Sequence, residues 1–403
     1  MWKLALRNVL RHKGRTSMTL LAIVAGVVGL ILSGGFVHDI FTQLGEILIH
    51  SQSGHLQVSP SGYFEQGARK PEKFLINDPA PLKQTIRSIG QVDDVMGRLY
   101  FSGLLNNGRS DLPIIGEGVE PGREARMGST LTITAGRKLE DHDRYSMMIG
   151  KGLALALKLK PGDQATLVIS TAEGARNSLD FEVAGVFQTF SKDYDARAVR
   201  IPLAAAQELL ATQGVNTLVV SLKRTQDTGV VAAELSKKFA GSNLEVKTWL
   251  ELNDFYAKTV EMYDVQFGVL RIIVLVMVLL SVANSVNMSV FERVGEFGTM
   301  MALGNRGLRV FSLIVMENSI VGLVGATSGV VLGVILALTI SAVGIPMPPP
   351  PNSDLSYLAH IRIVPAVIAG AFAVGLIATI IAAVFPAARV HRISVVEALR
   401  QNV

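Results

Sequence analysis

The fold of this chain is decided by the stretch Ser289-Val-Phe-Glu-Arg-Val-Gly-Glu-Phe-Gly-Thr-Met-Met-Ala-Leu-Gly-Asn-Arg306. It separates two long apolar runs, Ile272–Val290 and Val310–Val343. Charged side chains are costly to place in hydrocarbon. The stretch carries four of them: Glu292, Arg293, Glu296 and Arg306. We therefore predict a short amphipathic helix at the membrane surface, broken by Gly304 and Gly307.

Composition points to a membrane protein. Of the 403 residues, 49% are apolar and only 18% are charged. This balance is typical of a membrane protein with a sizeable polar domain. Because the chain has no cysteine, a disulfide framework and a thiolate metal site are both excluded. The absence of cysteine also fits a protein that faces an oxidising compartment.

Four apolar runs are long enough to cross a hydrocarbon core, which takes about 20 helical residues. They are Ser17–Val37, Leu270–Val290, Val310–Ser341 and Val364–Val384. A long polar block lies between the first two runs. We therefore predict an α-helical membrane protein with four transmembrane helices and a large α+β domain inserted between helices 1 and 2.

The uneven distribution of charge predicts the orientation. The short segments beside the spans hold 11 basic and 3 acidic residues, whereas residues 46–264 hold 25 basic and 27 acidic residues. Because basic residues concentrate in cytoplasmic flanks, we predict that both termini and the 292–309 segment are cytoplasmic. We expect no nucleic-acid binding, because the basic residues lie beside membrane spans.

The N-terminal segment Trp2–Arg15 combines apolar and basic residues, which predicts an interfacial helix on an anionic leaflet. The alternative is an ordinary basic flank that only fixes the topology. The small residues Ser33-Gly34-Gly35 are also compatible with a signal-peptide cleavage site. We expect an uncleaved anchor, because the apolar run is longer than a usual signal-peptide core.

The polar block alternates between short strand patterns and short helical patterns, and no single pattern marks a parallel sheet. We predict strands at 55–58, 94–105, 112–119, 146–150, 164–170, 179–187, 218–222 and 244–248, and helices at 79–90, 153–159, 201–210 and 228–239. The apolar pattern of the first span continues to Ile49, and a helical pattern runs from Leu250 into the second span. We therefore expect both helices to rise beyond the membrane as a stalk.

The third span places Gly325, Gly329 and Gly333 on one face, which predicts close helix packing. Glu317 lies near the inner end of the same helix. We favour a structural pairing with an arginine, and the alternative is a functional intramembrane charge. The following segment, Ile345–Asn352, is rich in proline, which lacks a backbone donor. We expect it to be a stiff loop that is neither helix nor paired strand.

The sequence contains no catalytic constellation that we recognise. It has no G-x-x-x-x-G-K-[ST] phosphate loop and no G-x-S-x-G nucleophile elbow. Its seven histidines show no metal-binding spacing. We therefore predict that the chain is not itself an enzyme and that it holds no metal and no cofactor.

Three parts of the sequence resemble the MacB/FtsX/LolC–LolE permeases of ABC transporters, the mechanotransmission superfamily. Phe291–Gly304 is similar to that family's R-x-x-E-[IF]-G-x-x-x-A-L-G segment. Phe385–Arg400 is similar to its closing P-A-x-x-A-x-x-x-x-P-x-x-A-L-R, with Val390 and Ser394 as departures. The third part, made of residues 149–163, 181–186 and 201–210, resembles its extracytoplasmic domain.

The resemblance implies that the segment between the second and third spans is a coupling helix, which docks in a groove of an ABC ATPase dimer. The implied contact residues are Glu292, Arg293, Glu296, Phe297, Gly298, Met301, Leu303 and Gly304. Phe297 and Met301 form an i, i+4 apolar pair, so we expect them to be the anchors. The alternative is a surface-lying loop without a partner.

Because this chain has no phosphate loop, ATP and magnesium would be bound by the partner ATPase. The resemblance also implies a second permease, either another copy or a homologous subunit, in the bacterial inner membrane. The layout looks most like the lipoprotein-releasing LolC/LolE subgroup, which extracts lipid-anchored proteins from the membrane for a periplasmic carrier. The alternatives are a MacB-like export pump with an adaptor and an FtsX-like regulator of a cell-wall hydrolase.

Together these observations predict nine segments. They are a cytoplasmic interfacial helix (1–16), a first transmembrane helix with its stalk (17–50), a periplasmic α+β domain (51–250), a second stalk and transmembrane helix (251–290), a cytoplasmic coupling helix (291–308), a third transmembrane helix (309–343), a periplasmic Pro-rich loop (344–362), a fourth transmembrane helix (363–386) and a cytoplasmic tail (387–403).

Overall fold

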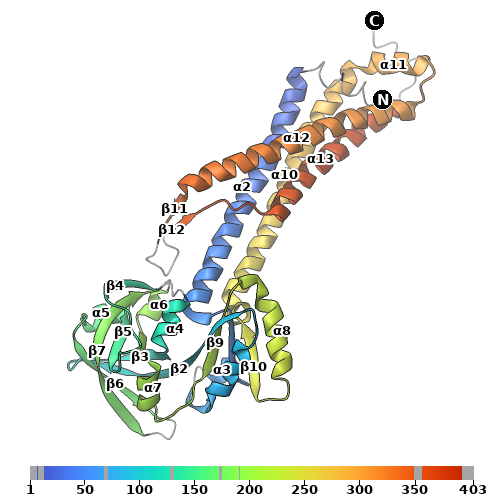
Figure 1. Cartoon of the computed structure of the whole chain (residues 1–403). Helices are drawn as coiled ribbons and strands as arrows, with labels where there is room; N and C mark the ends of the chain where they lie inside the picture. The colour runs from blue at the N-terminus through green and yellow to red at the C-terminus, as the bar shows by residue number, and fades with distance from the viewer. Residues whose placement is uncertain are drawn as a thin grey trace. The chain divides into compact units, whose positions relative to one another are not determined.

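The structure, a computed structural model, describes residues 7, 13–67, 71–127, 131–171, 175–189, 191–348 and 356–392. The chain divides into two compact units, and most of its helices and strands are labelled in Figure 1. Unit 1 contains residues up to 42, residues 259–347 and residues from 358 onward. Unit 2 contains residues 43–258 and 348–357.

Four helices are long and apolar enough to cross a membrane. They are α2 (Lys13–Leu48), α10 (Asp254–Glu292), α12 (Gly307–Val343) and α13 (Pro365–Arg392). A short helix, α11 (Val294–Ala302), connects α10 to α12. The end of α2 and the start of α10 belong to unit 2. The four predicted apolar helices are confirmed, and their orientation across a membrane stays a prediction.

The helices of unit 1 share one apolar core. In Figure 1, α12 and α13 lie side by side over most of their length. Every long helix and α11 contribute buried side chains, which include Ile23, Val282, Phe297, Ile314 and Ala378. Hydrocarbon is as apolar as these side chains, so close packing rather than a hydrophobic driving force holds such helices together.

Unit 1 differs from the sequence-based expectations in its last third. The expectation that Ile345–Asn352 contains no paired strand is wrong at its start, because β11 (Ile345–Met347) pairs with β12 (Tyr357–Ala359). In a two-stranded sheet every strand is an edge, where a proline without an N–H is tolerated. Residues 349–355 lie outside the described residues.

The last helix also differs, because it continues through Pro386 to Arg392 and does not end at the proline. A proline removes one helical hydrogen bond, but here the flanking residue Ala387 is packed in the core of the unit. The predicted interfacial helix at Trp2–Arg15 and the tail beyond residue 392 lie mostly outside the described residues.

Unit 2 is a mixed domain of strands and short helices, placed in the sequence between α2 and α10. Its strands are β1 (Leu56–Pro60), β2 (Val92–Asn106), β3 (Asp111–Val119), β4 (Thr132–Gly136), β5 (Ser146–Gly150), β6 (Gln164–Ser170), β7 (Arg176–Gln188), β8 (Ala198–Pro202), β9 (Thr217–Leu222) and β10 (Leu244–Thr248). Its helices are α3 (Pro79–Arg87), α4 (Pro121–Arg126), α5 (Lys151–Leu157), α6 (Lys192–Asp195), α7 (Leu203–Leu209), α8 (Thr228–Lys238) and α9 (Trp249–Leu252).

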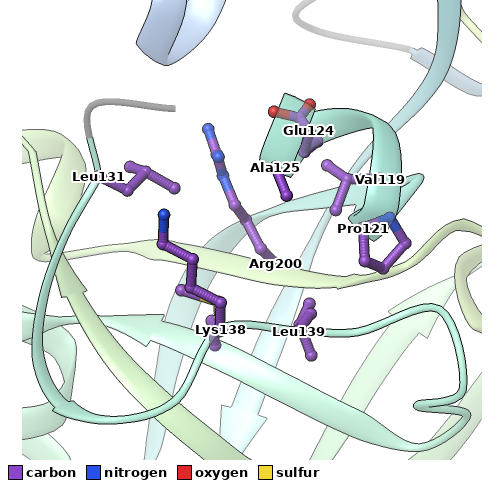
Figure 2. Close-up of a pocket in the computed structure, with 9 residues that line it drawn as sticks. Val119, Pro121, Glu124, Ala125, Leu131, Lys138, Leu139 and Arg200 are labelled. Carbon is purple, nitrogen blue, oxygen red and sulfur yellow. The ribbon is translucent and has the colours of Figure 1, made fainter. Parts of the chain in front are cut away.

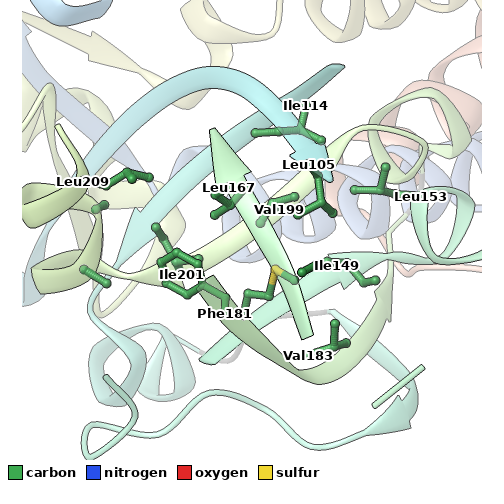
Figure 3. Close-up of a cluster of buried hydrophobic side chains, with 14 of the residues drawn as sticks. Leu105, Ile114, Ile149, Leu153, Leu167, Phe181, Val183, Val199, Ile201 and Leu209 are labelled. Carbon is green, nitrogen blue, oxygen red and sulfur yellow. The ribbon is translucent and has the colours of Figure 1, made fainter. Parts of the chain in front are cut away.

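Part of the sheet closes on itself. Strand β2 pairs with β3 and β6, β6 with β7, β7 with β5, β5 with β8, and β8 with β3, which completes a ring. The pairs β3–β8 and β5–β7 are parallel and the others are antiparallel. Closure leaves the ring without exposed edges. Its interior is filled by apolar side chains, among which Leu105, Ile149, Leu167, Phe181 and Val199 are labelled in Figure 3.

The rest of the sheet is open, with the strand order β10-β1-β9-β2. The long strand β2 belongs to both parts, since Val92–Arg98 pairs with β9 and Leu99–Asn106 pairs with β3. Apolar residues from α3 and α8, such as Ile86, Val231 and Leu235, cover the open part.

Most of the predicted strands and helices of the outer block are present, but four elements were not predicted: β4, β8, α4 and α6. The expectation of a helix at 201–210 is wrong at its start, because Ile201 and Pro202 end β8 and α7 begins only at Leu203. The expected uninterrupted helix from Leu250 is likewise wrong, since it breaks at Asn253 between α9 and α10.

Candidate functional site

The ends of α11 are defined by the local sequence. The helix α10 ends at Glu292, and Arg293 leaves the helical conformation before α11 begins. At the other end Gly304 adopts φ +94°. The N–H of Gly304 donates to the Met301 carbonyl at 3.0 Å, and the N–H of Asn305 donates to the Met300 carbonyl at 3.1 Å. This pair of bonds is a Schellman motif, which favours glycine in the left-handed conformation.

Arg293 ties α11 to α12 through a buried ion pair. Its Nη1 lies 2.8 Å from Oε2 of Glu317, and Nη2 lies 3.4 Å from Oε1. The two side chains are only 8% and 11% exposed. The Nε atom donates to Glu296 at 3.0 Å, and the guanidinium lies 5.0 Å from the centre of the Phe297 ring. The predicted pairing of Glu317 with an arginine is therefore present.

The charges of Arg293 and Glu317 hold the two side chains together. Burial alone would lower the pKa of Arg293, but its bonds to Glu317 and Glu296 raise that pKa above the ordinary value. Two charges taken out of water must stay paired, because removal of one partner from a buried pair costs about 3–5 kcal/mol. The start of α11 is therefore held against α12 by more than apolar packing.

The apolar face of α11 is turned into the bundle. Phe297 is 1% exposed and belongs to the core of unit 1. Gly298 is buried beside it, and Met301 is half-buried. The expectation that Phe297 anchors a partner protein does not hold in this structure, because the bundle itself already covers the ring. Arg293 and Gly298 are likewise turned inward, so they position α11 and do not offer a contact surface.

A different face of the segment is exposed. The predicted contact residues that lie on it are Glu292, Glu296, Leu303 and Gly304. Thr299, which sequence reasoning missed, lies between them at helical spacing. Leu303 is 80% exposed, a high value for a leucine. The face therefore combines two carboxylates with one apolar side chain.

The three glycines predicted for helix packing lie against α2. A methyl group on Gly325 would lie 3.0 Å from Ile23 and one on Gly333 would lie 3.1 Å from Ile31. At Gly329 the distance to Cβ of Val27 would be only 2.8 Å. Because both helices present these residues at four-residue spacing, the contact is a regular seam.

Unit 2 contains a second buried charged cluster, which sequence reasoning missed. Arg98 lies 2.6 Å from Glu124, and Arg200 lies 3.0 Å from Glu117. The Tyr194 hydroxyl donates to Glu117 at 2.6 Å. Burial acts to raise the pKa of Glu117, but the charges of Arg200 and Arg98 lower it overall. Single arginines inside apolar strand patterns, as at Val199-Arg200-Ile201, were the available signal.

Figure 2 shows Arg200 and Glu124 beside a cavity of about 40 Å³ that apolar side chains such as Leu131 and Leu139 also line. A space of this size holds a water molecule but no larger ligand. Within the described ranges, no three histidine or acidic side chains converge as a metal site would require.

Two family models match the chain. Residues 16–238 match the MacB-like periplasmic core domain, and residues 268–395 match the FtsX-like permease C-terminal family. The first match includes α2 and most of unit 2, and the second includes α11, α12 and α13. The resemblance inferred from the sequence is thereby confirmed.

The chain is also similar to curated permeases. It is 25% identical to an uncharacterized ABC transporter permease of Methanocaldococcus jannaschii, over 84% of each chain. It is 24% identical to the lipoprotein-releasing system transmembrane protein LolC of Xylella fastidiosa, over 58% of each chain. It is 21% identical to the macrolide export ATP-binding/permease protein MacB of Campylobacter jejuni, over 86% of this chain and 55% of that protein. This chain therefore belongs to the MacB/FtsX/LolCE family of ABC transporter permeases.

Proposed function

We propose that this permease converts ATP hydrolysis by a separate ATPase subunit into a conformational change of unit 2, and that residues 291–308 are the segment through which it is driven. The observation that carries the proposal is the buried Arg293–Glu317 pair. A force applied to α11 passes into α12 through this ion pair, because the Arg293 side chain is buried and bonded to Glu317 and does not move freely in solvent. A loose surface loop would absorb the same force.

The proposed contact with the ATPase is the exposed face of the segment. Leu303 supplies the apolar contact, and Glu292 and Glu296 supply charges for the rim. This face is held in position by residues on the opposite side of the segment, which packs on the bundle: Phe297, Met301, Arg293 and Gly298. The predicted coupling residues thus divide into a contact group and a positioning group.

A separate ATPase is supported by the sequence and by the printed name of one relative. The sequence has no phosphate loop. The relative from Campylobacter jejuni is named an ATP-binding/permease protein, so ATP binding accompanies the permease in that relative. We propose that ATP and magnesium are bound by a partner ATPase dimer, and that a second permease, either another copy or a homologous subunit, completes the complex.

The proposed location is the bacterial inner membrane, with both termini and α11 in the cytoplasm and unit 2 in the periplasm. The 11 basic and 3 acidic residues beside the spans support this orientation. The match to the MacB-like periplasmic core domain supports the placement of unit 2.

For the cargo, we propose a lipoprotein or a lipid-like molecule taken from the outer leaflet and passed to a periplasmic carrier. The similarity to LolC, a lipoprotein-releasing protein by name, supports this class. A second candidate is export with an adaptor, which the similarity to a macrolide exporter favours. A third is regulation of a cell-wall hydrolase without transport, which the FtsX-like match favours.

An ATP-hydrolysis assay distinguishes these candidates. The tagged permease would be purified from its native membranes with the ATPase that accompanies it and placed in nanodiscs. We expect a triacylated peptide to stimulate hydrolysis and the same peptide without acyl chains to have no effect. Stimulation by a macrolide alone would favour export. Hydrolysis that responds to neither compound would contradict a transported amphiphile.

A further inference from the structure

The end of α2 carries a histidine held between two hydrogen-bond acceptors. We propose that His50 is a proton-binding site that acts as a latch: its imidazolium ties α2 to the strand domain of unit 2, and loss of the proton releases the tie. All residues of this latch belong to unit 2. The proposed function does not use them.

The backbone holds His50 in an unusual turn. After Leu48 the helix widens into a single π-helical turn, Ile49–Ser53. Gly54, at φ +62°, ends this turn, and its N–H donates to the Ile49 carbonyl at 2.9 Å. π-Helical turns are rare and are frequently found at functional sites. The Ser51 carbonyl accepts a hydrogen bond from the buried Arg200 at 3.1 Å, so the turn is anchored to the charged cluster of the strand domain.

The ring of His50 faces an acceptor on each side. Its Nδ1 lies 2.7 Å from the Met127 carbonyl oxygen, at the end of α4. Its Nε2 lies 3.2 Å from Oε2 of Glu46, one turn earlier on α2. A carbonyl and a carboxylate only accept hydrogen bonds, and a neutral imidazole has one N–H. Only the doubly protonated ring can satisfy both contacts.

The neighbouring histidine does not compete for that proton. The Nδ1 atom of His55 accepts the N–H of Leu222 at 3.1 Å, so this nitrogen carries no hydrogen. Its Nε2 lies 3.3 Å from the hydroxyl oxygen of Thr225, and that hydroxyl donates to Glu46 at 2.9 Å. Burial, and then the charge of His50, lower the pKa of His55 to about 4. His55 therefore stays neutral and holds Glu46 in place from the other side.

Among the residues that the structure describes, two further titratable groups act on this cluster, one from β2 and one from α10. Asp93 acts on His55, where its charge weakly opposes the effect of burial. Tyr256 interacts with the carboxylate of Glu46. Neither group replaces the N–H that Glu46 receives from His50.

Loss of the proton turns one contact from attractive to repulsive. A carboxylate is a stronger acceptor than a carbonyl, so the neutral ring keeps its hydrogen on Nε2 for Glu46. The bare Nδ1 then faces the Met127 carbonyl oxygen 2.7 Å away. The latch therefore closes toward acidic pH and opens toward alkaline pH. The effect of latch opening on the transmission of force along α2 depends on the proposed function. The existence of the latch does not depend on it.

Hydrogen exchange on the full chain in nanodiscs tests the latch. Rates would be corrected for the direct effect of pH on amide exchange. In the wild-type chain we expect exchange in peptides covering residues 44–56 to rise about tenfold between pH 5.5 and 8.5, because a charge-assisted bond is lost. In Glu46→Gln this rise disappears, since the amide group can donate to the bare Nε2 and the neutral ring then keeps its hydrogen on Nδ1 for Met127. His50→Gln removes the rise as well.

The matched control is His142→Gln. His142 also pairs with a glutamate, Glu140, at 3.3 Å, but the histidine side chain is 74% exposed. We expect this variant to keep the wild-type pH response. A rise that persists in Glu46→Gln, or its absence from the wild-type chain, would overturn the proposal. So would ¹⁵N chemical shifts showing a neutral His50 ring at pH 5.5, with the resonance identified by its loss in His50→Gln. None of these measurements uses ATP, so they fail or succeed independently of the proposed function.

Discussion

Arg293 and Glu317 form an ion pair in which Nη1 of the arginine lies 2.8 Å from Oε2 of the glutamate, inside the helix bundle. The pair joins the residue that precedes α11 to the first third of α12. Because both charges are shielded from solvent, each depends on the other. The position of the exposed face of α11 is therefore fixed by two side chains that do not lie on that face.

Removal of Glu317 should strongly destabilise the bundle. We expect Glu317→Ala to lower the free energy of unfolding by about 3–5 kcal/mol, because Arg293 stays buried and loses its buried partner. Glu296→Ala is the matched control, since it also removes a carboxylate from Arg293 but a half-exposed one, and it should cost less than about 1 kcal/mol. Thermal unfolding in detergent micelles measures both. Equal effects of the two variants would show that the buried pair is not special.

The glycine seam between α12 and α2 should not tolerate a methyl group at its closest point. We expect Gly329→Ala to destabilise the chain by about 1–3 kcal/mol, because the new Cβ would lie 2.8 Å from that of Val27. Gly370→Ala, where nothing lies within 4 Å, should be neutral or stabilising by up to about 1 kcal/mol. Thermal unfolding of the two variants measures both effects. A stabilising Gly329→Ala would rule out close packing between α12 and α2 at this position.

The buried neutral His55 should make unit 2 sensitive to acid. Its pKa is about 4 in the folded chain against an ordinary 6.5, so the unfolded chain binds the proton first as the pH falls. The stability that His55 contributes is present above pH 6.5 and is lost between about pH 6.5 and 4. His55→Gln should lessen this loss, because a glutamine oxygen can still accept the Leu222 N–H. Melting temperatures at pH 7 and 4.5 test this, with His142→Gln as the control. If acid lowers the melting temperature of His55→Gln as much as that of the wild-type chain, other groups cause the acid sensitivity.

The long helices could be predicted from the sequence because each one is an unbroken apolar run whose length fits a bilayer. The break at Gly304 could be predicted for a local reason as well, since helices commonly end at a glycine in the left-handed conformation. The strand β8 could not be predicted from the sequence. It is a five-residue buried strand that passes into α7 without a turn residue other than Pro202, so its apolar pattern merges with that of the helix.

The sequence predicts that the site lies in residues 291–308, and this stays a prediction, but it does not predict which face of α11 is exposed. An amphipathic helix such as α11 has one apolar stripe, and the sequence does not tell whether a partner or the chain's own bundle covers it. In the structure the bundle covers Phe297. The pair Arg293–Glu317 was not predictable in detail, because all of α11, a turn and the start of α12 separate its members. The ring closure of β2 with β6 is a nonlocal contact of the same kind.

The most direct test of the account is site-specific photo-crosslinking in native membranes. A benzophenone amino acid would be placed at Leu303 in one variant and at Phe297 in another, and the crosslinked products would be identified by mass spectrometry. If α11 is the segment through which ATP hydrolysis drives the permease, the Leu303 position forms an adduct with a protein that contains a phosphate loop, and the buried Phe297 position forms only contacts within the chain. An ATPase adduct at Phe297 and none at Leu303, or no ATPase adduct at either position, would contradict it.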